Sequence, residues 1–403
     1  MKQVRLKDVV VINANALTDS TPEDFSFRYV DIGSVSQGLV SIPTDEMSFG
    51  SAPSRARRLA EAGDTIVSTV RTYLRAVAAV PKTDEPLVFS TGFAVLHPKR
   101  EIDGRYLSYY CQSGPFVDEV VARSVGVSYP AINPGEIGNF LLDLPTLEDQ
   151  RRIADFLDAE TVRVDRLVGL RQAQERLLGD ESALLASFFE RPPQNSREVP
   201  VKHLTTLITS GPRGWGEYLA PEGSPFVRIT NVSRRGIHLD LRDLATVQAP
   251  DGSERERSNT RNGDVLVSIT ADLGSVGVVE GDASGGNVSQ HLALLRPNRS
   301  RCVPEWLAWA IKSPRANRSL LSSGYGGTKQ GLGLGDVANL RLAVPSVPEQ
   351  GRIAREIGAR CDVTTQLLSA LSRGISLISE RRAAVITAAV SGQLDATTAR
   401  GAA

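Results

Sequence analysis

The chain has 403 residues, of which 41% are hydrophobic and 23% are charged, and its 46 basic side chains balance 46 acidic ones. A chain of this length exceeds one ordinary hydrophobic core, so two or three folding units are expected. The balanced charge differs from the basic excess of a typical nucleic-acid-binding protein, so any DNA contact must use local patches or positively charged partners.

The sequence predicts neither a membrane span nor a metal cluster. No apolar run reaches the roughly 18 residues that a transmembrane helix needs. The three cysteines, Cys111, Cys302 and Cys361, stand far apart and lack the CxxC spacing of zinc sites. We therefore expect a cytoplasmic protein with reduced, buried thiols and no membrane association.

Residues 1–145 are predicted to form a small domain of mixed strands and helices. Short β-branched runs such as "DTIVSTV" from Asp64 and "FAVLHP" from Phe93 have the length of strands and are separated by Gly, Pro and Asn. A short helix is predicted from Tyr106 to Ser113. The sequence therefore predicts an α/β domain with short helices between its strands.

A long helix and a linker are predicted over residues 146–197. Thr146 stands three residues before Asp149, the capping-box spacing at which a hydroxyl caps the first helical turn and a carboxylate reaches back. Apolar positions then recur every three or four residues from Ile153 to Phe188. About forty residues at ~1.5 Å each would give a rod of ~60 Å.

Residues 198–345 repeat the first domain at a separation of about 200 residues. "GDVLVSIT" at 263 matches "GDTIVSTV" at 63, and "EWLAWAIKS" at 305 matches "RYLSYYCQS" at 105. "GDVANLRLAVP" at 335 matches "GEIGNFLLDLP" at 135. Because one separation holds through several blocks, the sequence predicts a tandem duplication with a second domain over 198–345.

The last part of the chain, residues 346–403, repeats the long helix. "PSVPEQGRIA" at 345 matches "PTLEDQRRIA" at 145, Ser346 and Glu349 have the capping-box spacing, and an apolar seam runs from Ile353 to Ala389. The predicted fold class is α+β, with two α/β domains related by a pseudo-twofold axis and separated by two long antiparallel, coiled-coil-like helices. The alternative is that each helix packs only on its own domain.

No constellation of residues requires catalysis. The chain has no GxxxxGK[ST] phosphate loop and no [DNS]PP[YF] signature of amino methyltransferases. His97, His203, His238 and His291 show no HxxxH spacing, so no metal site is predicted. The sequence therefore favours a binding protein over an enzyme.

The ends of the long helices resemble the conserved regions of type I restriction-modification specificity subunits. "ISERRAAVITAAVSGQLD" at 378–395 is similar to the C-terminal conserved region of that family. "LPTLEDQRRIADFLD" and "VPSVPEQGRIAREI" are similar to the helix starts of the same family, and the order of domain, helix, domain, helix is shared. The first helix ends "QERLLGDESALLASFFE" and lacks the Glu-Arg-Arg run, so the two partner-facing surfaces need not be alike.

The resemblance implies a non-catalytic subunit that reads a bipartite target in double-stranded DNA through two target recognition domains. It also implies docking of two methyltransferase subunits, and it allows two restriction subunits to join. No cofactor is expected in this chain, whereas the complex would use S-adenosylmethionine, together with ATP and Mg when restriction subunits are present. Alternatives are a two-headed structural adaptor, a specificity subunit of a related DNA-modification defence system, and an enzyme of unknown motif.

Candidate DNA-binding residues are basic, amide and aromatic side chains in predicted loops, because Arg suits guanine and phosphate and Gln suits adenine. For each residue taken alone, a solvated surface role is an equal alternative. In the first domain the candidates are Arg55, Arg57, Arg58, Arg71, Tyr73, Arg75, Ser128 and Tyr129. In the second they are Arg213, Trp215, Arg234, Arg235, Gln290, His291, Thr328, Lys329 and Gln330. The resemblance implies that Glu380, Arg381 and Arg382, near the end of the second helix, face a partner subunit.

Overall fold

The computed structural model describes residues 2–270, 272–323 and 331–395. The chain forms two compact units. Unit 1 comprises the residues up to Gln172 together with those from Ser372 onward, and unit 2 comprises Ala173–Leu371. Each unit therefore contains one domain and a segment of both long helices. The two units divide within these helices, so they do not test the predicted domain limits at 145, 197 and 345.

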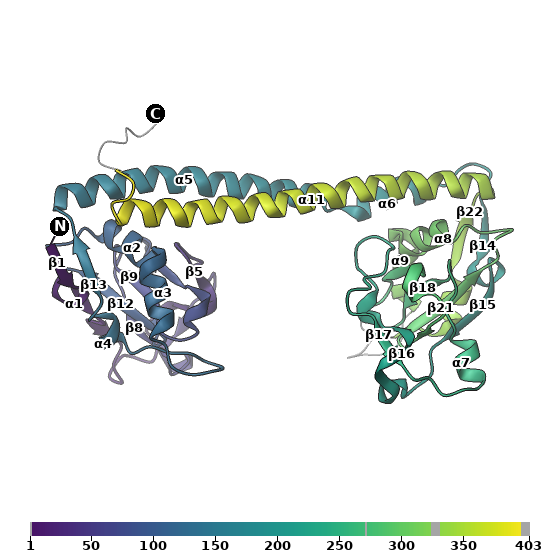
Figure 1. Ribbon diagram of the computed structural model, residues 1–403, viewed down its shortest axis with the longest axis horizontal. Helices are drawn as coiled ribbons and strands as arrows, with labels where there is room; N and C mark the ends of the chain where they lie inside the picture. The colour runs from purple at the N-terminus through teal and green to yellow at the C-terminus, as the bar shows by residue number, and fades with distance from the viewer. Residues whose placement is uncertain (1, 271, 324–330, 396–403) are drawn as a thin grey trace. The chain divides into compact units, whose positions relative to one another are not determined.

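The domain of unit 1 is built from two main sheets (Figure 1). Its first sheet has the order β10 (Val77–Ala79), β9 (Thr65–Ser68), β12 (Phe93–Pro98), β2 (Val10–Ile12), with antiparallel neighbours throughout. Its second has the order β3 (Asn15–Ala16), β8 (Ala56–Leu59), β11 (Leu87–Ser90), β4 (Ser26–Val30), β7 (Met47–Ser48). Two small pairs join β1 (Lys2–Arg5) to β13 (Leu141–Leu144) and β5 (Val35–Ser36) to β6 (Leu39–Val40). The helices are α1 (Leu6–Val9), α2 (Gly104–Gln112), α3 (Gly114–Ala122) and α4 (Pro134–Ile137).

The domain of unit 2 repeats this plan. One sheet has the order β15 (Thr205–Ser210), β21 (Leu292–Pro297), β18 (Val265–Ser268), β19 (Val276–Val278), and another has the order β17 (Ala245–Val247), β16 (Leu219–Val227), β20 (Asn287–Val288). β14 (Arg197–Pro200) pairs with β22 (Arg341–Val344) as β1 pairs with β13. The helices are α7 (Ser253–Arg257), α8 (Pro304–Lys312), α9 (Pro314–Ser323) and α10 (Leu334–Asn339). The predicted short helix from Tyr106 to Ser113 is confirmed as α2, shifted by one or two residues, and the matching stretch of the repeat forms α8.

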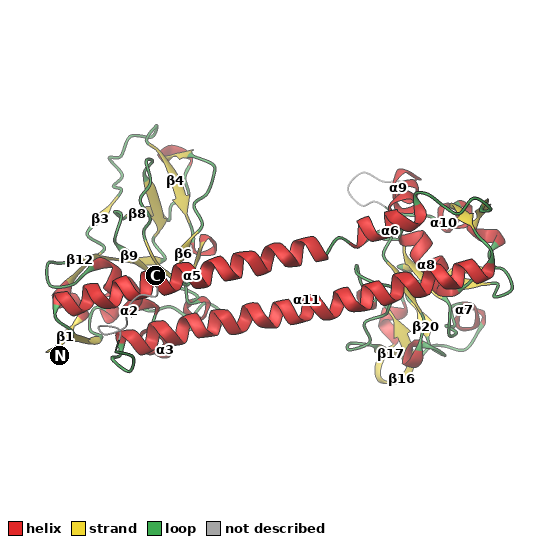
Figure 2. Cartoon of the chain, turned by 90° about the horizontal axis from the view of Figure 1, so that it is seen from above, coloured by secondary structure: helices red, strands yellow, loops and turns green. Residues whose placement is uncertain are grey.

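The first long helix is shorter than predicted. It ends as α5 (Leu147–Leu178), and a separate helix α6 (Glu181–Phe189) follows after a short loop that Figure 2 shows. The Asp180 carboxylate accepts a hydrogen bond from the Ala183 N–H and so caps the start of α6. The prediction of one helix through Phe188 is therefore wrong, because Gly179 and Asp180 end one helix and start another. The second long helix, α11 (Val347–Val390), is continuous.

The two predicted capping boxes differ. Thr146 Oγ1 accepts a hydrogen bond from the Asp149 N–H, as predicted, but the Asp149 carboxylate accepts from the Thr146 hydroxyl at 2.7 Å instead of a backbone N–H. In the second copy, the Glu349 carboxylate is engaged by the Arg352 guanidinium at 2.7 Å. The predicted box at Ser346 is thus replaced by a side-chain pair within the first turns of α11.

Each unit buries the apolar seams of both helices in one core. In unit 1, Ile153 and Leu157 of α5 share a core with Ile386 and Ala389 of α11 and with α2, which lies directly beneath the helices (Figure 1). Unit 2 has the same arrangement, with Leu185 of α6 packed in one core with α8 and the start of α11. The sequence left open whether the long helices pack on each other or on the domains. Both kinds of packing occur, since each helix contacts a domain and the other helix.

Candidate nucleic-acid interface

Three segments that lie far apart in the sequence meet in unit 1. They are residues 69–75 after β9, the turn 90–92 and residues 124–131 between α3 and α4. The Arg71 N–H donates to the Pro130 carbonyl at 2.8 Å, and the Thr69 N–H donates to the Gly92 carbonyl at 2.8 Å. Val70 also forms an isolated bridge with Ala131. We call the region formed by 69–75, 90–92 and 124–131 the first loop surface.

Aromatic and basic side chains cover this surface. The Arg71 guanidinium lies 5.0 Å from the centre of the Tyr129 ring, a cation–π contact. Tyr129 and Tyr73 are 66% and 55% exposed. Arg75 forms an ion pair with Asp118 at 3.0 Å, and Ser128 is exposed beside Tyr129. An open aromatic ring backed by a guanidinium can stack on a base or contact a phosphate.

The backbone of the first loop surface is strained. Arg71 and Arg75 have φ angles of 51° and 53°, in the left-handed region. Among the described residues that are not glycine, only Asn13 shares a positive φ. Each such residue costs on the order of 1–3 kcal/mol, and residues of this kind cluster at binding sites, where the surrounding structure holds them in place. The strain supports a functional role for the segment 71–75.

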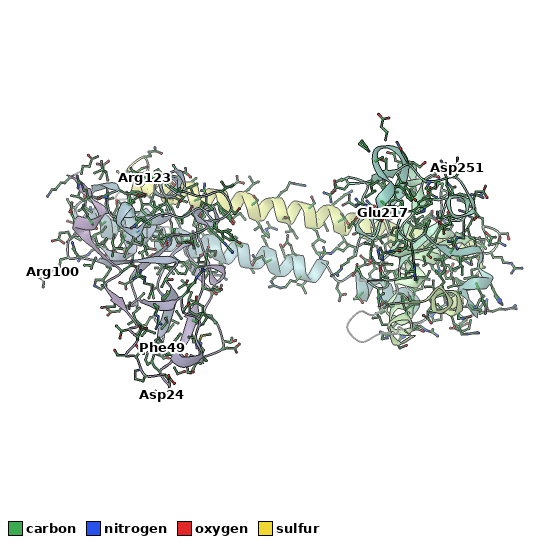
Figure 3. All side chains as sticks on the ribbon, turned by 90° about the horizontal axis from the view of Figure 1, so that it is seen from below. Asp24, Phe49, Arg100, Arg123, Glu217 and Asp251 are labelled. Carbon is green, nitrogen blue, oxygen red and sulfur yellow. The ribbon has the colours of Figure 1, made fainter. Side chains whose placement is uncertain are left out.

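The first cluster of predicted arginines is divided by the fold. The Arg55 carbonyl accepts a hydrogen bond from the Thr91 N–H at 2.8 Å, which places Arg55 beside the first loop surface. Arg57 lies over the Phe49 ring at 4.7 Å. In Figure 3, Phe49 lies at the opposite end of the domain from Arg123, the residue that precedes segment 124–131. Arg57 is therefore separate from that segment.

Arg57 and Arg58 both belong to β8, inside a sheet. Arg57 also pairs with Asp19 at 3.2 Å, and Arg58 is half-buried opposite Ala16. Their guanidinium groups are thus occupied or partly covered by the domain itself. Within the predicted triplet, Arg55 has the position most suited to contact a ligand at the first loop surface.

Equivalent segments meet in unit 2. The Ile269 N–H donates to the His291 carbonyl at 3.1 Å, and Thr270 bridges Gly331 as Val70 bridges Ala131. The His291 ring binds the Thr270 hydroxyl through Nδ1 at 2.8 Å, and Gln290 lies 3.3 Å from its Nε2. We call residues 269, 270, 272–275 and 289–291 the second loop surface. The predicted residues Thr328, Lys329 and Gln330 lie outside the described residues.

Two neighbouring arginines of unit 2 have different surroundings. Arg234 Nε lies 2.9 Å from the Asp272 carboxylate, so Arg234 adjoins the second loop surface. Arg235 lies beside Gly179, at the break between α5 and α6. Both arginines line a pocket with residues 272–275 of the second loop surface, and Arg234 also forms an ion pair there.

The structure corrects the prediction that Trp215 contacts DNA. Its side chain is only 4% exposed and packs with Phe226 and Val247 in a small core, so the ring face is covered by the protein itself. Arg213 remains exposed. It follows Gly211, where an added Cβ would lie 1.9 Å from the Val288 carbonyl oxygen, so only glycine allows this close approach to the turn that begins at residue 289.

The sequence patterns did not single out two exposed apolar residues of the first loop surface. Val125 and Val127 flank Gly126 and are 80% and 101% exposed. The run "SVGVSYP" places two valines outside any predicted helix or strand, which was the available signal. Apolar side chains exposed beside Tyr129 suit contact with base faces or thymine methyl groups.

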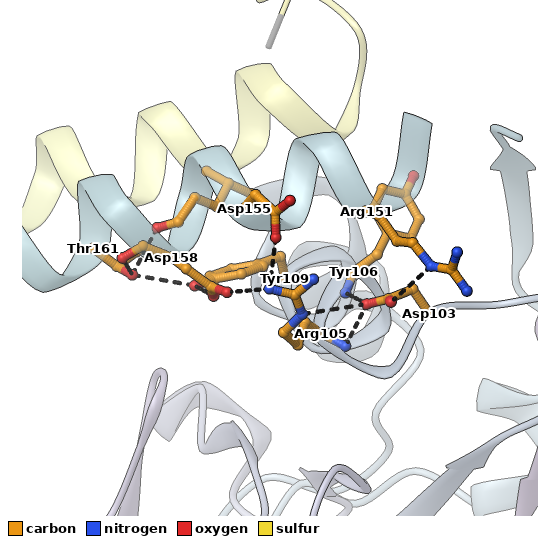
Figure 4. A network of polar contacts seen from close by, with 9 residues as sticks. Asp103, Arg105, Tyr106, Tyr109, Arg151, Asp155, Asp158 and Thr161 are labelled. Atoms are coloured by element: carbon orange, nitrogen blue, oxygen red, sulfur yellow. Dashed lines mark hydrogen bonds and ion pairs between the residues drawn. The ribbon is translucent and has the colours of Figure 1, made fainter. Parts of the chain in front are cut away.

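A polar network fixes the domain of unit 1 on α5 (Figure 4). The Arg105 guanidinium pairs with Asp155 at 2.8 Å and with Asp158 at 2.7 Å. The Tyr109 hydroxyl donates to the Asp158 carboxylate at 2.7 Å. Burial raises the pKa of Tyr109, so this hydroxyl keeps its proton. The network ties α2, and hence the domain, to one face of the helix.

A buried glutamine holds each domain to the start of a long helix. Gln150 is fully buried; its Oε1 accepts from the Asp103 N–H at 2.8 Å, and its Nε2 donates to the Glu101 and Pro145 carbonyls. Gln350 makes the same three bonds with the Val303 N–H and the carbonyls of residues 301 and 345. These glutamines belong to the repeated helix start, but the pattern alone gave them no role.

The predicted partner-facing residues of α11 separate into two groups. Glu380 and Arg381 are exposed. The Arg382 side chain is only 16% exposed; its Nε lies 3.3 Å from Asp165, and its Nη1 lies 3.4 Å from Gln112 Oε1. The Arg382 guanidinium thus contacts unit 1 itself, which leaves Glu380 and Arg381 as the exposed residues of the predicted set.

The cysteines have the surroundings of packing residues. Cys111 and Cys302 are buried and Cys361 is half-buried. Burial raises the pKa of Cys302 to about 12 and that of Cys361 to about 11, so both thiols stay protonated near neutral pH. Across 2–270, 272–323 and 331–395, no group of three His, Cys, Asp or Glu side chains has the geometry of a metal site. None of the helices in this part of the chain has both the length and the hydrophobicity of a membrane span.

Comparison with known proteins gives the class of this fold. Residues 1–165 match the family described as the type I restriction modification DNA specificity domain. A solved chain from a study of complex assembly and conformational transition of the type I R-M system superposes with a TM-score of 0.77, at 25% identity over 98% of both chains. The HsdS subunit from Thermoanaerobacter tengcongensis gives a TM-score of 0.52, at 26% identity over 98% of this chain and 97% of that one. The class is a DNA specificity protein.

Full-length relatives extend this result. The chain is 21% identical to the type I restriction enzyme EcoBI specificity subunit of Escherichia coli over 77% of this chain and 70% of the relative. It is 23% identical to the EcoKI specificity subunit of Escherichia coli strain K12 over 76% and 69%. Residues 1–165 therefore carry the DNA specificity domain of this family, and the whole chain is similar to the specificity subunits of type I restriction-modification systems. The comparisons agree with the prediction of a non-catalytic specificity subunit.

Proposed function

We propose that the chain reads a bipartite DNA target, with each loop surface contacting one half-site. The observation that carries this proposal is a repeated convergence of segments. The contacts of 69–70 with 90–92 and Ala131 in unit 1 have counterparts in the contacts of 269–270 with 289–291 and Gly331 in unit 2. Both surfaces present side chains that can contact DNA, with Arg71 and Tyr129 in one and Gln290 and His291 in the other. Two similar sites on one chain suit a target with two parts.

Partner docking is the second part of the proposal. The long helices expose apolar residues that the domains do not cover, including Leu170, Leu177 and Leu377, at 56%, 82% and 64% exposure. Exposed apolar residues along a helix favour an interface with another protein. We propose that two methyltransferase subunits cover these positions and that restriction subunits join them in the full complex, in the cytoplasm. S-adenosylmethionine, ATP and Mg would then be bound by the partners and not by this chain.

The proposal can be tested by titrating labelled duplexes with the assembled complex of this chain and its methyltransferase subunit. Methylome sequencing of a host that expresses both would first give the methylated motif. A duplex with this motif should bind at least about 10³-fold more tightly than random duplexes, above a background that weakens steeply with salt. Equal affinity for all duplexes would favour the two-headed adaptor instead.

Each half-site can be assigned by exchanging residues 198–345 for those of a related subunit. One half of the methylated motif should change and the other should stay the same, because each domain has its own core and its own loop surface. A simultaneous change of both halves would contradict the assignment of one half-site to each unit.

A further inference from the structure

The end of α11 in unit 1 and the helix α6 in unit 2 occupy equivalent places on their domains. Ile386 and Ala389 of α11 pack in the core of unit 1, and Leu185 and Phe188 of α6 pack in the core of unit 2. These two pairs have the same spacing. Counting back one helical turn from each pair makes Arg382 the counterpart of Glu181. The domain residues that face them are also counterparts, because Gln112 ends α2 and Lys312 ends α8.

In unit 2 the buried pair is an ion pair. Lys312 Nζ lies 3.2 Å from a Glu181 oxygen and donates to the carbonyls of Arg234 at 2.6 Å and Gly236 at 2.8 Å. The Lys312 side chain is only 9% exposed. The other Glu181 oxygen accepts from the Gly236 N–H at 2.9 Å. The ammonium therefore donates to two carbonyls and forms an ion pair with Glu181, whose other oxygen is held by a backbone N–H.

In unit 1 the cation belongs to the helix and the domain supplies a neutral amide. Arg382 faces Gln112 Oε1 at 3.4 Å, and its charge is balanced by Asp165 of α5 at 3.3 Å. The Gln112 Nε2 donates to the Ser108 carbonyl at 3.1 Å, which leaves the Gln112 oxygen turned toward Arg382. In unit 2, Thr365 stands in the place of Asp165, so the balancing carboxylate is absent there.

We propose that these two pairs make each recognition domain compatible in charge with its own helix end and incompatible with the other. Docking the second domain on α11 would bury the Lys312 ammonium beside the Arg382 guanidinium. Docking the first domain on α6 would leave the Glu181 carboxylate facing the amide of Gln112 with no cation. A buried charge without a partner, or beside a like charge, is strongly destabilising. The order of the two readers along the chain is thus fixed by chemistry as well as by connectivity. This inference does not depend on which residues read DNA.

The test is a chain in which residues 1–145 and 198–345 exchange places. Its melting temperature should fall by about 5–10 °C, because like charges become buried together. Adding Gln112→Lys and Lys312→Gln to the exchanged chain should restore most of this loss. In the parent chain the same two substitutions should lower the melting temperature by a similar amount. Equal effects of the two substitutions in both arrangements would overturn the proposal.

A second comparison avoids the exchange and applies if the exchanged chain does not fold. In the parent, Gln112→Lys alone should lower the melting temperature of unit 1 by several degrees, because it places a cation beside Arg382. Adding Arg382→Glu and Asp165→Thr recreates the arrangement of unit 2 and should recover at least half of the loss. A triple variant as unstable as Gln112→Lys alone would show that these pairs do not match each domain to one helix end.

Discussion

Unit 1 and unit 2 hold their domains on the long helices with the same backbone lock but with different side chains. Gln150 and Gln350 make equivalent sets of three hydrogen bonds to the backbone. Beyond this lock, unit 1 uses the charged network of Arg105, Tyr109 and Asp158. Both helix starts carry a glutamine where these backbone groups must be satisfied, whereas the side chains of the rest of the interface differ.

Unit 2 has no counterpart of this network at the equivalent positions. Glu305, Trp309 and Gly358 replace Arg105, Tyr109 and Asp158. Trp309, Gly358 and Cys361 line a cavity of about 510 Å³ next to the break between α5 and α6. The comparison shows that a duplicated fold needs the same geometry at both copies, while each copy can reach it through its own contacts. The predictions below test where the two units are equivalent and where they differ.

The largest expected effect is on the shared lock. Gln350→Ala would leave the buried Pro345 carbonyl and the part-buried Val303 N–H and Arg301 carbonyl without these partners, and would empty a fully buried side-chain site, at a cost of about 3–5 kcal/mol. Gln150→Ala should cost the same in unit 1. Calorimetry of each variant would measure the losses, with Gln366→Ala, at an exposed position of α11, as the matched control. A loss in only one unit would break the equivalence of the two locks.

The next effect concerns the spacing between the half-sites, which we propose the helices set. Four residues inserted after Gly169 in α5 and four after Ser379 in α11 add about one turn, or ~6 Å, to both helices. The spacer of the methylated motif should lengthen by one or two base pairs at ~3.4 Å each, with both half-sites unchanged.

Two residues inserted at the same places are the control for this experiment. They rotate the following seams by ~200° and should damage assembly without changing the motif. An unchanged spacer in the four-residue variant, read by methylome sequencing, would show that the helices do not set the distance between the readers.

A smaller effect is expected from the first loop surface alone. Arg71→Ala combined with Tyr129→Ala removes the cation–π pair and should weaken binding of the methylated duplex by about 10-fold to 100-fold. The melting temperature should hold, because Arg71 and Tyr129 are exposed and neither packs in a core. Arg100→Ala, an exposed arginine at another edge of the domain (Figure 3), is the control. If Arg100→Ala weakens binding equally, the effect is one of charge and not of this surface.

The smallest effect sharpens the difference between the two interfaces. Gly358 lies in the interior of α11, and an added Cβ there would meet open space. Gly358→Ala should therefore raise the stability of unit 2 by about 0.5–1 kcal/mol, through helix propensity alone. Calorimetry would measure this gain, with Gly374→Ala, an equally open position in α11, as a reference. A destabilised Gly358→Ala variant would mean that the cavity beside it has a structural occupant.

Local patterns were sufficient to predict the elements and their order. Strand-length β-branched runs, the spacing of apolar residues and the repeat located the sheets, α2, α8 and both long helices, because each pattern acts over a few residues. The break after α5 was missed because the three- or four-residue spacing of the apolar positions continues across it. Gly179 and Asp180, a helix stop followed by a cap, were the local signal for it.

The sequence by itself determined that this protein is a tandem repeat of two α/β domains on long helices and that it resembles the specificity-subunit family. Only the tertiary structure decided which predicted residues share a surface. Arg71 meets Tyr129 across 57 intervening residues, Trp215 is withdrawn into a core and Arg382 turns toward Gln112. Such contacts join residues far apart in the chain, and side-chain burial and charge pairing between packed elements, not local propensity, fix them.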